Sequence, residues 1–325
     1  MNTPLDRGIF TLSLDFELVW GSRDLYADPA SLIAQAQLTR ERVFERLLSL
    51  LTTNGITATW ATVGHLFLQS ASRQDGLLHP TLTPPQHSWR STPWFEGVPE
   101  GSEAEHPTWY GRSLLLRLKD AEQDIGSHSF SHAIFGDPGC SRECAESELA
   151  RCVSAAADLD IELRSFVFPR NQVGHVELLG KYGFTCWRGS APVWYHNKRL
   201  PGAIRRVAHF VAVGAAVSPV TVLPYRDPHG LWCIPASGSF LPTYGVRRII
   251  PIRQRVRRAI RGIDAAAAER RVSHFWLHPI NLADDPKRLL DAMAQIIEHA
   301  ARLRDQGRLE IDSMAAIAAQ AEARS

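Results

Sequence analysis

The sequence has no long hydrophobic run and no basic segment followed by an apolar one near its start. Asp6, Arg7, Asp15 and Glu17 interrupt the first apolar segment, so we expect no secretory signal peptide. No apolar stretch reaches the roughly 18–20 residues that a helix needs to cross a bilayer. From these absences we expect a chain without a membrane-spanning helix and with a cytoplasmic location.

Cysteine is scarce, with five residues in a chain of 325. A small and odd number argues against a disulfide framework and predicts a reduced chain. Cys140 and Cys144 lie close together, but no second cysteine pair accompanies them. We therefore expect these two residues at the start of a helix and not as metal ligands.

The charge is nearly balanced, with a net value of +2, and 45% of the residues are hydrophobic. This composition is ordinary for a soluble globular protein with a sizeable core. No repeat of arginine with aromatic residues argues for a nucleic-acid partner. Residues 247–271 are rich in arginine, and this stretch would form either a solvated helix face or a contact with an anionic partner. Such a partner would be a phosphate-bearing substrate or a membrane surface bound peripherally.

Residues 9–17 alternate between apolar and polar side chains, which predicts a β-strand. Asp15 and Glu17 then share one face at the carboxyl end, about 6–7 Å apart along the strand. A solvated polar face would explain them if they stood alone. Paired carboxylates at the end of a strand also allow one acid to hold a metal while its neighbour handles a proton.

His128 and His132 lie four residues apart, just after a short strand-like segment that ends at Gly126. On a helical turn these positions share a face, so two neutral imidazoles could bind one divalent cation. A polar surface turn is the simpler explanation of such a pair taken alone. A second pair, His274 and His278, lies in a strand-like segment, where four residues span roughly 13 Å and cannot share a metal.

Strand-like and helix-like segments alternate along most of the chain. A helix is predicted over residues 31–54, with Ser31 as its N-cap and Asn54-Gly55 as its end. The other predicted strands are 56–64, 164–168, 184–188, 272–278 and 309–311, and the other predicted helices are 141–159, 175–182, 286–306 and 313–323. We predict an α/β fold, a distorted (β/α) barrel with about seven strands, as a single catalytic domain over residues 1–325.

Two segments lose this periodicity, and we interpret them as long loop insertions at about 70–120 and 190–245. The first is rich in proline, glycine, histidine and tryptophan, and its aromatic residues argue against disorder. Because sugars often stack on aromatic rings, we interpret residues 70–112 as a loop that covers a substrate. The alternative is a packed excursion that meets no ligand. His65, at the end of the second strand, is expected to be structural.

Four polar clusters follow the carboxyl ends of predicted strands. They are Asp15 with Glu17, His128 with His132, Pro169 with Arg170, and His278. In a β/α barrel the active site assembles at that end of the strands. Four such clusters at equivalent positions are much less expected by accident than any one of them.

These motifs resemble those of the polysaccharide deacetylase family, whose shared unit is the NodB homology domain and which includes family 4 carbohydrate esterases. The family's first motif ends a strand with an acidic pair, to which Leu12–Glu17 is similar with one residue between the acids. Its second motif, His-Ser/Thr-x-x-His, is matched by His128–His132, and its last motif is similar to Leu277-His278. The resemblance spans about residues 8–282 and implies a distorted β/α barrel.

The third and fourth motifs depart from the family pattern. The third has arginine before proline, whereas the order here is Pro169-Arg170, followed by Asn171. The fourth, Asp-x-x-Asp-Trp, is not visible, and Trp187 is the nearest candidate for its aromatic residue. From the resemblance we predict that Arg170, Asn171 and Trp187 bind substrate.

Chemistry and resemblance together predict a metal-dependent hydrolase that removes N-acetyl or related acyl groups from an amino sugar in a glycan or glycan precursor. A divalent ion, with Zn²⁺ as the first choice, would be held by Glu17, His128 and His132. Asp15 would be the base and His278 would protonate the leaving amine. An exchange of roles between Asp15 and Glu17 stays open. A cytoplasmic chain would meet a carbohydrate substrate linked to a nucleotide or a lipid.

Two other functions stay open. One is a metal-dependent amidohydrolase acting on a small cyclic amide, similar to the allantoinase-like relatives of the family. The other is a non-catalytic sugar-binding protein on the same scaffold. The altered third and fourth motifs keep the second possibility open, whereas the intact histidines and carboxylates oppose it.

Overall fold

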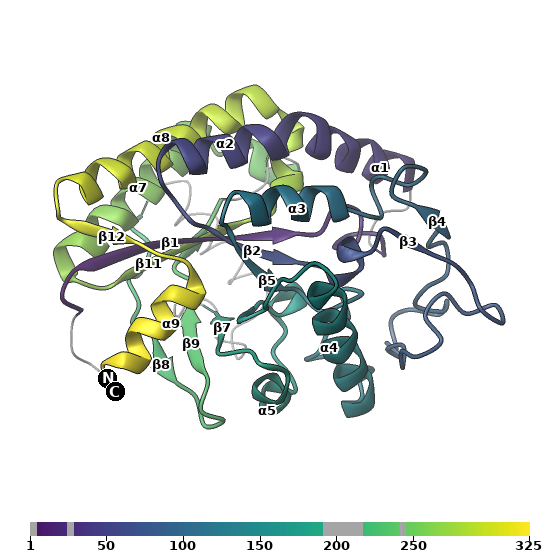
Figure 1. The fold of residues 1–325 in the computed structure, drawn as a ribbon. Coiled ribbons are helices and arrows are strands. Elements are labelled where there is room, and N and C mark those ends of the chain that lie inside the picture. The colour runs from purple at the N-terminus through teal and green to yellow at the C-terminus, as the bar shows by residue number, and fades with distance from the viewer. Residues whose placement is uncertain (1–4, 25–28, 191–216, 241–242, 244) are drawn as a thin grey trace.

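A parallel β-sheet lies at the centre of the computed structural model, which describes residues 5–24, 29–190, 217–240, 243 and 245–325 (Figure 1). Its strands, in spatial order, are β10 (Gly238–Ser239), β11 (Val272–Leu277), β1 (Gly8–Phe16), β2 (Thr59–Thr62), β5 (Asp124–Ser127), β6 (Ser165–Phe166), β7 (Cys186–Gly189), β9 (Trp232–Pro235) and β8 (Tyr225–Arg226). Only β8 runs antiparallel to its neighbour in this order, and β12 (Leu309–Ile311) pairs with the start of β1. The carboxyl ends of the parallel strands therefore meet at one rim.

The sheet curls back on itself through one stretch of chain. β9 pairs with β7, and β10, which follows β9 closely, pairs with β11. Between these two strands, the Ala236 amide donates to the Gly189 carbonyl and the Ser237 amide donates to the His274 carbonyl, each at 2.8 Å. Consecutive residues thus bond to β7 on one side and β11 on the other. The predicted distorted (β/α) barrel is confirmed.

Helices cover the outside of this curled sheet. α1 (Pro29–Leu38) continues through a π-helical stretch (Thr39–Phe44) into α2 (Glu45–Thr53), where one helix was predicted. α8 (Pro286–Asp305) contacts both α2 and α7 (Ile252–Glu269), and the three run together along one side of the sheet (Figure 1). The remaining described helices are α3 (Arg112–Asp120), α4 (Arg142–Ala157), α5 (Val176–Leu179) and α9 (Met314–Ala323). Short 3₁₀ segments lie at Gly64–Phe67, Pro169–Asn171, Gly180–Tyr182, Gly245–Ile249 and Pro279–Asp284.

Side-chain caps fix the starts of several helices. The Ser141 hydroxyl accepts a hydrogen bond from the Cys144 amide at 3.2 Å, and Ser313 caps α9 in the same way. Such caps contribute about 0.5–2 kcal/mol each. Cys144 therefore lies in the first turn of α4, and all five cysteines are free and buried. None of the described helices has the length and apolar character that a bilayer crossing requires.

Strand β1 shows how this fold positions polar groups. All nine of its residues are buried, so the strand has no solvated face. Its even-numbered residues, such as Phe10 and Leu14, belong to the hydrophobic core, where each buried side chain contributes roughly 1.5–3 kcal/mol. Its odd-numbered residues Ser13 and Asp15 point to the opposite face, because side chains alternate along a strand. That face is the polar interior of the barrel.

The predicted insertions need one correction. Residues 70–120 contain the small antiparallel pair β3 (Ser70–Ala71) and β4 (Gly101–Ser102) as well as α3. Of the range 190–245, residues 191–216, 241–242 and 244 lie outside the described residues. Residues 232–239, however, supply β9 and β10 and belong to the barrel. Such short strands, interrupted by Pro235 and Gly238, carry no alternating pattern that the sequence could reveal.

The arginine-rich stretch forms α7 and the 3₁₀ segment before it. Val256 and Ile263 pack inward as expected, but Arg255 and Arg258 are buried too, contrary to the expectation of a helix that exposes its arginines. The Arg255 guanidinium donates to the backbone carbonyl of Arg247 at 2.6 Å. Part of this charge therefore holds the chain together, while residues such as Arg253 and Arg257 face solvent.

Candidate metal centre

Two carboxylates stand at the carboxyl end of β1. Asp15 is the second-last residue of the strand and Glu17 follows its end, so both point to the interior face. They are 3% and 4% exposed, so these are buried acids and not a solvated strand face. Buried carboxylates need partners of opposite charge or a metal.

Both histidines of the His128–His132 pair meet Glu17. The His128 Nε2 atom lies 3.0 Å and the His132 Nε2 atom 3.3 Å from Glu17 Oε1. The segment between them is not the helical turn that the spacing suggested, because Ser129 (φ 56°) and His132 (φ 62°) adopt left-handed backbone conformations. The turn thus brings the rings together by a different route, with their centroids 5.1 Å apart.

Surrounding groups fix the orientation of these rings. The His128 Nδ1 atom lies 2.7 Å from the Val167 carbonyl oxygen, which can only accept, so Nδ1 donates there and Nε2 is the nitrogen that faces Glu17. The Ser131 amide and hydroxyl donate to the Glu148 carboxylate at 2.8 and 2.5 Å. The Trp94 indole donates to the Ser131 hydroxyl at 2.8 Å. Both α4 and the loop of residues 70–112 therefore support the turn.

Gly21 leaves the space in which the Glu17 carboxylate lies. A Cβ atom at position 21 would lie 1.7 Å from Glu17 Oε2, far inside van der Waals contact. The backbone turns back here, since the Trp20 amide donates to the Glu17 carbonyl at 2.9 Å. Glycine suits this position because of this close approach of the Glu17 carboxylate and not because of its backbone angles. No pattern in the sequence singled out this residue.

Arg188 holds Asp15 from the opposite side of the barrel. Its two terminal nitrogens donate to the two Asp15 oxygens at 2.5 and 2.8 Å, and Nη2 also donates to Asn171 Oδ1 at 3.2 Å. The guanidinium lies 4.5 Å above the Trp276 ring. The sequence reasoning missed Arg188, although the single charged residue in the strand-like segment 184–188 was a usable signal.

His278 completes the cluster from the end of β11. Its Nε2 atom lies 3.7 Å from both Asp15 Oδ2 and Glu17 Oε1. Its side chain is 31% exposed, whereas the other members of the cluster are almost fully buried. His278 is therefore the member of this group that solvent or a ligand can reach.

The second histidine of that strand has a separate role. His274 is fully buried, with Nε2 2.9 Å from the Ser13 hydroxyl and Nδ1 3.2 Å from the Ile234 carbonyl. Ser13 in turn accepts from Arg188 Nη1 at 3.1 Å. Burial, reinforced by the positive charge of Arg188, lowers the pKa of His274 to about 3. Among the described residues, His278 belongs to a candidate cluster with Asp15 and Glu17, whereas His274 is in neither candidate cluster.

The charges of the cluster are set by competing effects. Burial would raise the pKa of Asp15, but the charge and hydrogen bonds of Arg188 bring it below its ordinary value. Burial opposes ionisation of Glu17 as well, and the three neighbouring histidines nevertheless bring its pKa well below the usual range. The pKa of His132 is lowered, mainly by burial. The cluster therefore combines two carboxylates with at least one neutral imidazole.

These donors fit a divalent cation. One ligand atom each from Glu17, His128 and His132 lies within 4.8 Å of the others, and the same holds for Asp15, Glu17 and His278. A neutral imidazole Nε2 and a carboxylate oxygen repel each other at 3.0 Å unless a proton or a cation lies between them. Two histidines and one carboxylate are a ligand set typical of catalytic zinc sites, which keep a fourth position for water or substrate.

Two of the three predicted substrate-binding residues lie elsewhere. Arg170 forms an ion pair with Asp24 and lies 5.1 Å over the Trp89 ring. Trp187 is 8% exposed, and its indole donates to Asp227 Oδ2 at 2.8 Å. Because neighbouring residues of a strand face opposite ways, Trp187 points away from the interior that Arg188 occupies. Asn171 contacts the cluster through Arg188, and the charge of Arg170 contributes, after burial, to the lowered pKa of His132.

Neither a family model nor a curated protein sequence matches this chain. Solved structures do match it. A Mycobacterium smegmatis protein assigned as a polysaccharide deacetylase shares 14% identity at a TM-score of 0.63, over 100% of this chain and 93% of its own. A Pseudomonas aeruginosa PAO1 protein with the same assignment shares 11% identity at a TM-score of 0.60, over 95% and 89% of the two chains. Puue allantoinase shares 12% identity at a TM-score of 0.59, over 95% and 88%. At such identities the likeness shows the fold, which is that of NodB-like polysaccharide deacetylases, as the motifs predicted.

Proposed function

We propose that this chain, which has the fold of the polysaccharide deacetylases, is a metal-dependent hydrolase that removes an N-acetyl or related acyl group from an amino sugar. One observation carries the proposal. A buried set of three ligand atoms from Glu17, His128 and His132 lies directly beside Asp15, a second carboxylate that Arg188 keeps ionised. A ligand set and a separate base are the two parts that amide hydrolysis at a metal requires.

In this mechanism Glu17, His128 and His132 would hold the ion, which when bound would polarise the amide carbonyl and lower the pKa of water towards about 7. Asp15 accepts a proton from the attacking water, and Arg188 keeps its carboxylate oriented. The water oxygen joins the acyl carbon, and the carbon–nitrogen bond breaks. His278, on the accessible side of the cluster, gives a proton to the leaving nitrogen. The products are a carboxylic acid, such as acetate, and a free amine.

The proposal extends to the metal, the cellular location and the form of the substrate. Zn²⁺ is the first choice of metal because of the two imidazole ligands. Five free, buried cysteines fit a reduced, cytoplasmic location, where the substrate would be a nucleotide- or lipid-linked glycan precursor. Exposed residues of the arginine-rich stretch, such as Arg253 and Arg257, would meet phosphates of that precursor or a membrane surface.

A second candidate is hydrolysis of a small cyclic amide. The TM-score of 0.59 with Puue allantoinase is close to the values for the two deacetylase-assigned proteins, so the fold alone does not separate these reactions. In this chain either reaction would use Glu17, His128 and His132 as ligands and Asp15 as the base. The two reactions differ in the substrate that reaches His278. Parallel assays with N-acetylglucosamine oligomers and with hydantoin, a five-membered cyclic amide, distinguish them.

The test measures acetate release and bound metal on the same preparations. We expect acetate release that a chelator abolishes and Zn²⁺ restores. Glu17→Gln and His132→Ala should lose bound metal, whereas Asp15→Asn should keep the metal and lose about 10²–10⁴-fold in rate. Asp120→Asn, at an exposed position on α3, is the matched control and should change neither quantity. Chelator-resistant activity, or full activity of Asp15→Asn, would refute the assignment. Metal binding without hydrolysis would favour the non-catalytic binding protein.

A further inference from the structure

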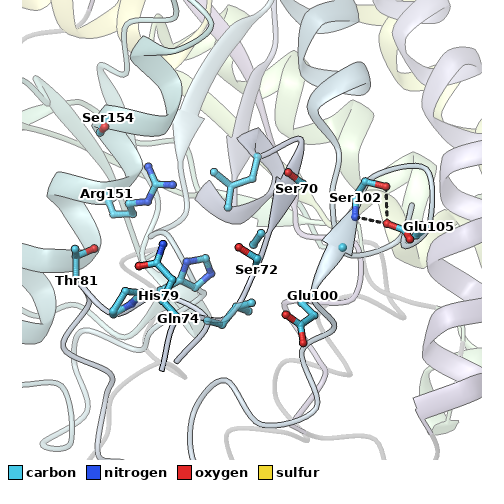
Figure 2. Close-up of a pocket in the computed structure, with 15 residues that line it drawn as sticks. Ser70, Ser72, Gln74, His79, Thr81, Glu100, Ser102, Glu105, Arg151 and Ser154 are labelled. Carbon is cyan, nitrogen blue, oxygen red and sulfur yellow. Dashed lines mark hydrogen bonds between the residues drawn. The ribbon is translucent and has the colours of Figure 1, made fainter. Parts of the chain in front are cut away.

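A polar cavity of about 980 Å³ lies between α4 and the antiparallel strands β3 and β4, and none of its lining residues belongs to the candidate metal centre. Hydroxyl and amide side chains form a large part of its wall, beside apolar and charged ones, as Figure 2 shows. They include Ser70, Ser72, Gln74, Thr81, Ser102 and Ser154. Such groups both donate and accept hydrogen bonds, so they suit a ligand that carries several hydroxyl groups.

Arg151 brings a positive charge to the α4 side of this cavity (Figure 2). Among the described residues no hydrogen bond or ion pair to its guanidinium is recorded, and its one ring contact is with Phe130, at 5.4 Å. Ser154 lies one turn further along the same helix and also lines the cavity. A guanidinium offers five donors in a planar fork that matches a carboxylate or a phosphate. The Arg151 guanidinium is therefore available to pair with an anionic group of a ligand.

His79 lies on the same side as Arg151 in Figure 2 and has a buried Nε2 atom without a hydrogen-bond partner. Burial, together with the charge of Arg151, lowers the pKa of His79 to about 4. The ring is therefore neutral at pH 7 and does not compete with Arg151 for an anion. An unpaired buried nitrogen is costly, and a ligand hydroxyl group would satisfy it once a small movement of the cavity wall exposes it.

The opposite side carries two carboxylates that do not reach Arg151. Glu105 accepts from the Ser102 amide and hydroxyl, each at 2.8 Å, and Glu100 accepts from the Arg73 amide at 3.0 Å. Backbone donors thus hold both acids on their own side of the cavity. These carboxylates can accept hydrogen bonds from the hydroxyl groups of a ligand, but they would repel an anionic group on their side of the cavity. The cavity therefore carries negative charge on the side of Glu100 and Glu105 and positive charge on the side of Arg151, with hydroxyl side chains between them.

We propose that this cavity is a binding site for a small polyhydroxylated ligand with a single anionic group, such as an acidic or phosphorylated sugar. The anionic group pairs with Arg151 and Ser154. The hydroxyl groups of the ligand extend towards Ser72 and the carboxylate side. Phosphate and carboxylate offer the same chemistry to a guanidinium, so the experiment separates these two sources of the charge.

The test compares three sugars that share one ring: glucose, glucuronate and glucose 6-phosphate. Binding is followed by calorimetry and by amide chemical shifts in metal-free protein, so the metal cluster does not contribute. We expect one or both anionic sugars to bind at millimolar concentration, about tenfold or more tightly than glucose, with shifts at Ser72 and Ser154. Preference for one of the two identifies the anionic group. Equal binding of all three sugars, or no binding by any, would overturn the proposal.

Variants of α4 locate the effect. Arg151→Gln should abolish the preference for an anionic sugar, and Arg151→Lys, which keeps the charge, should retain part of it. Arg142→Gln removes the same charge from the same helix at an exposed position that pairs with Glu177, and it should leave binding unchanged. Equal loss in Arg142→Gln and Arg151→Gln would show a general charge effect and would contradict the proposed site. Failure here leaves the proposed hydrolase untouched, because its own test uses acetate release and metal content.

Discussion

Arg188 and Asp15 join strands that are not neighbours in the sheet. The two residues are 173 positions apart, and two hydrogen bonds of 2.5 and 2.8 Å connect them across the barrel interior. Burial alone would favour the protonated form of Asp15, and Arg188 is the strongest influence in the opposite direction. The pair thus both ties β7 to β1 and keeps the proposed base ready to accept a proton.

Replacing Arg188 by methionine should raise the pKa of Asp15, because burial then acts with less opposition. The base would be ionised only at higher pH, so the acid limb of the kcat/KM profile for acetate release should move to higher pH. A buried carboxylate without its partner should also lower the free energy of unfolding by about 3–5 kcal/mol. Rate–pH profiles and urea unfolding measure the two effects.

Arg188→Lys provides the matched comparison, since it keeps the charge but not the two-pronged contact. We expect it to fold and to show a smaller shift of the acid limb than the methionine variant. An acid limb at the same pH in wild type and both variants would show that Arg188 does not control the ionisation of the base.

Gly21→Ala should weaken metal binding while the protein stays folded. The added methyl group would overlap the end of the flexible Glu17 side chain, so the carboxylate can move away at little cost in stability. Once it moves, it no longer meets His128 and His132. We expect metal affinity to fall by about 10–100-fold, as for other changes around ligands, with a melting temperature near that of wild type.

Gly180→Ala is the control for this experiment. An added Cβ there lies 3.9 Å from its nearest neighbour, and the backbone angles of position 180 are helical. Metal titrations of both variants decide the matter. Unchanged affinity in Gly21→Ala would mean that Glu17 finds another route to the ion.

The residues of the site differ in how much the sequence could reveal. Glu17, His128 and His132 were predictable, because strand alternation and a short turn place such residue types at one rim. Arg188 was not predicted, because the family motif pointed to its neighbour Trp187. Adjacent residues of a strand face opposite sides of the sheet, so Arg188 points to the interior and Trp187 to the exterior. Gly21 is important because it leaves room for the Glu17 side chain in its observed conformation. No residue pattern in the sequence predicts such a contact.

The elements of the fold also differ in how far the sequence could predict them. Long periodic segments such as β1 and α8 were predictable, because their patterns repeat over many residues. The closure of the barrel was not, since consecutive residues at 236 and 237 bond to different strands. That arrangement depends on contacts between distant segments, and no local preference of the chain signals it.

Trp187→Phe should affect stability and not substrate binding. The variant loses the indole hydrogen bond to Asp227, a residue whose carboxylate also accepts from the His229 and Leu231 amides. We expect a loss of about 1–3 kcal/mol in the free energy of unfolding with KM unchanged. Urea unfolding and steady-state kinetics test this together. A tenfold rise in KM without loss of stability would instead place Trp187 against the substrate.

His274 should make the fold sensitive to mild acid. Its ordinary pKa of 6.5 falls to about 3 in the folded chain, mainly through burial. Between these values the unfolded chain binds a proton that the folded chain does not, so stability is complete above about pH 6.5 and declines as pH falls. The loss attributable to His274 should reach roughly 3 kcal/mol between pH 7 and pH 4.

The variant His274→Gln keeps a polar side chain at this position but cannot titrate. The free energy of unfolding of the wild type should exceed that of the variant at pH 7, and this difference should shrink by that amount at pH 4. Both proteins retain His65 and His79, whose pKa values burial also lowers, and their contributions cancel in the comparison. A gap that stays constant from pH 7 to pH 4 would mean that His274 accepts a proton in the folded barrel, against its hydrogen bonds to Ser13 and Ile234.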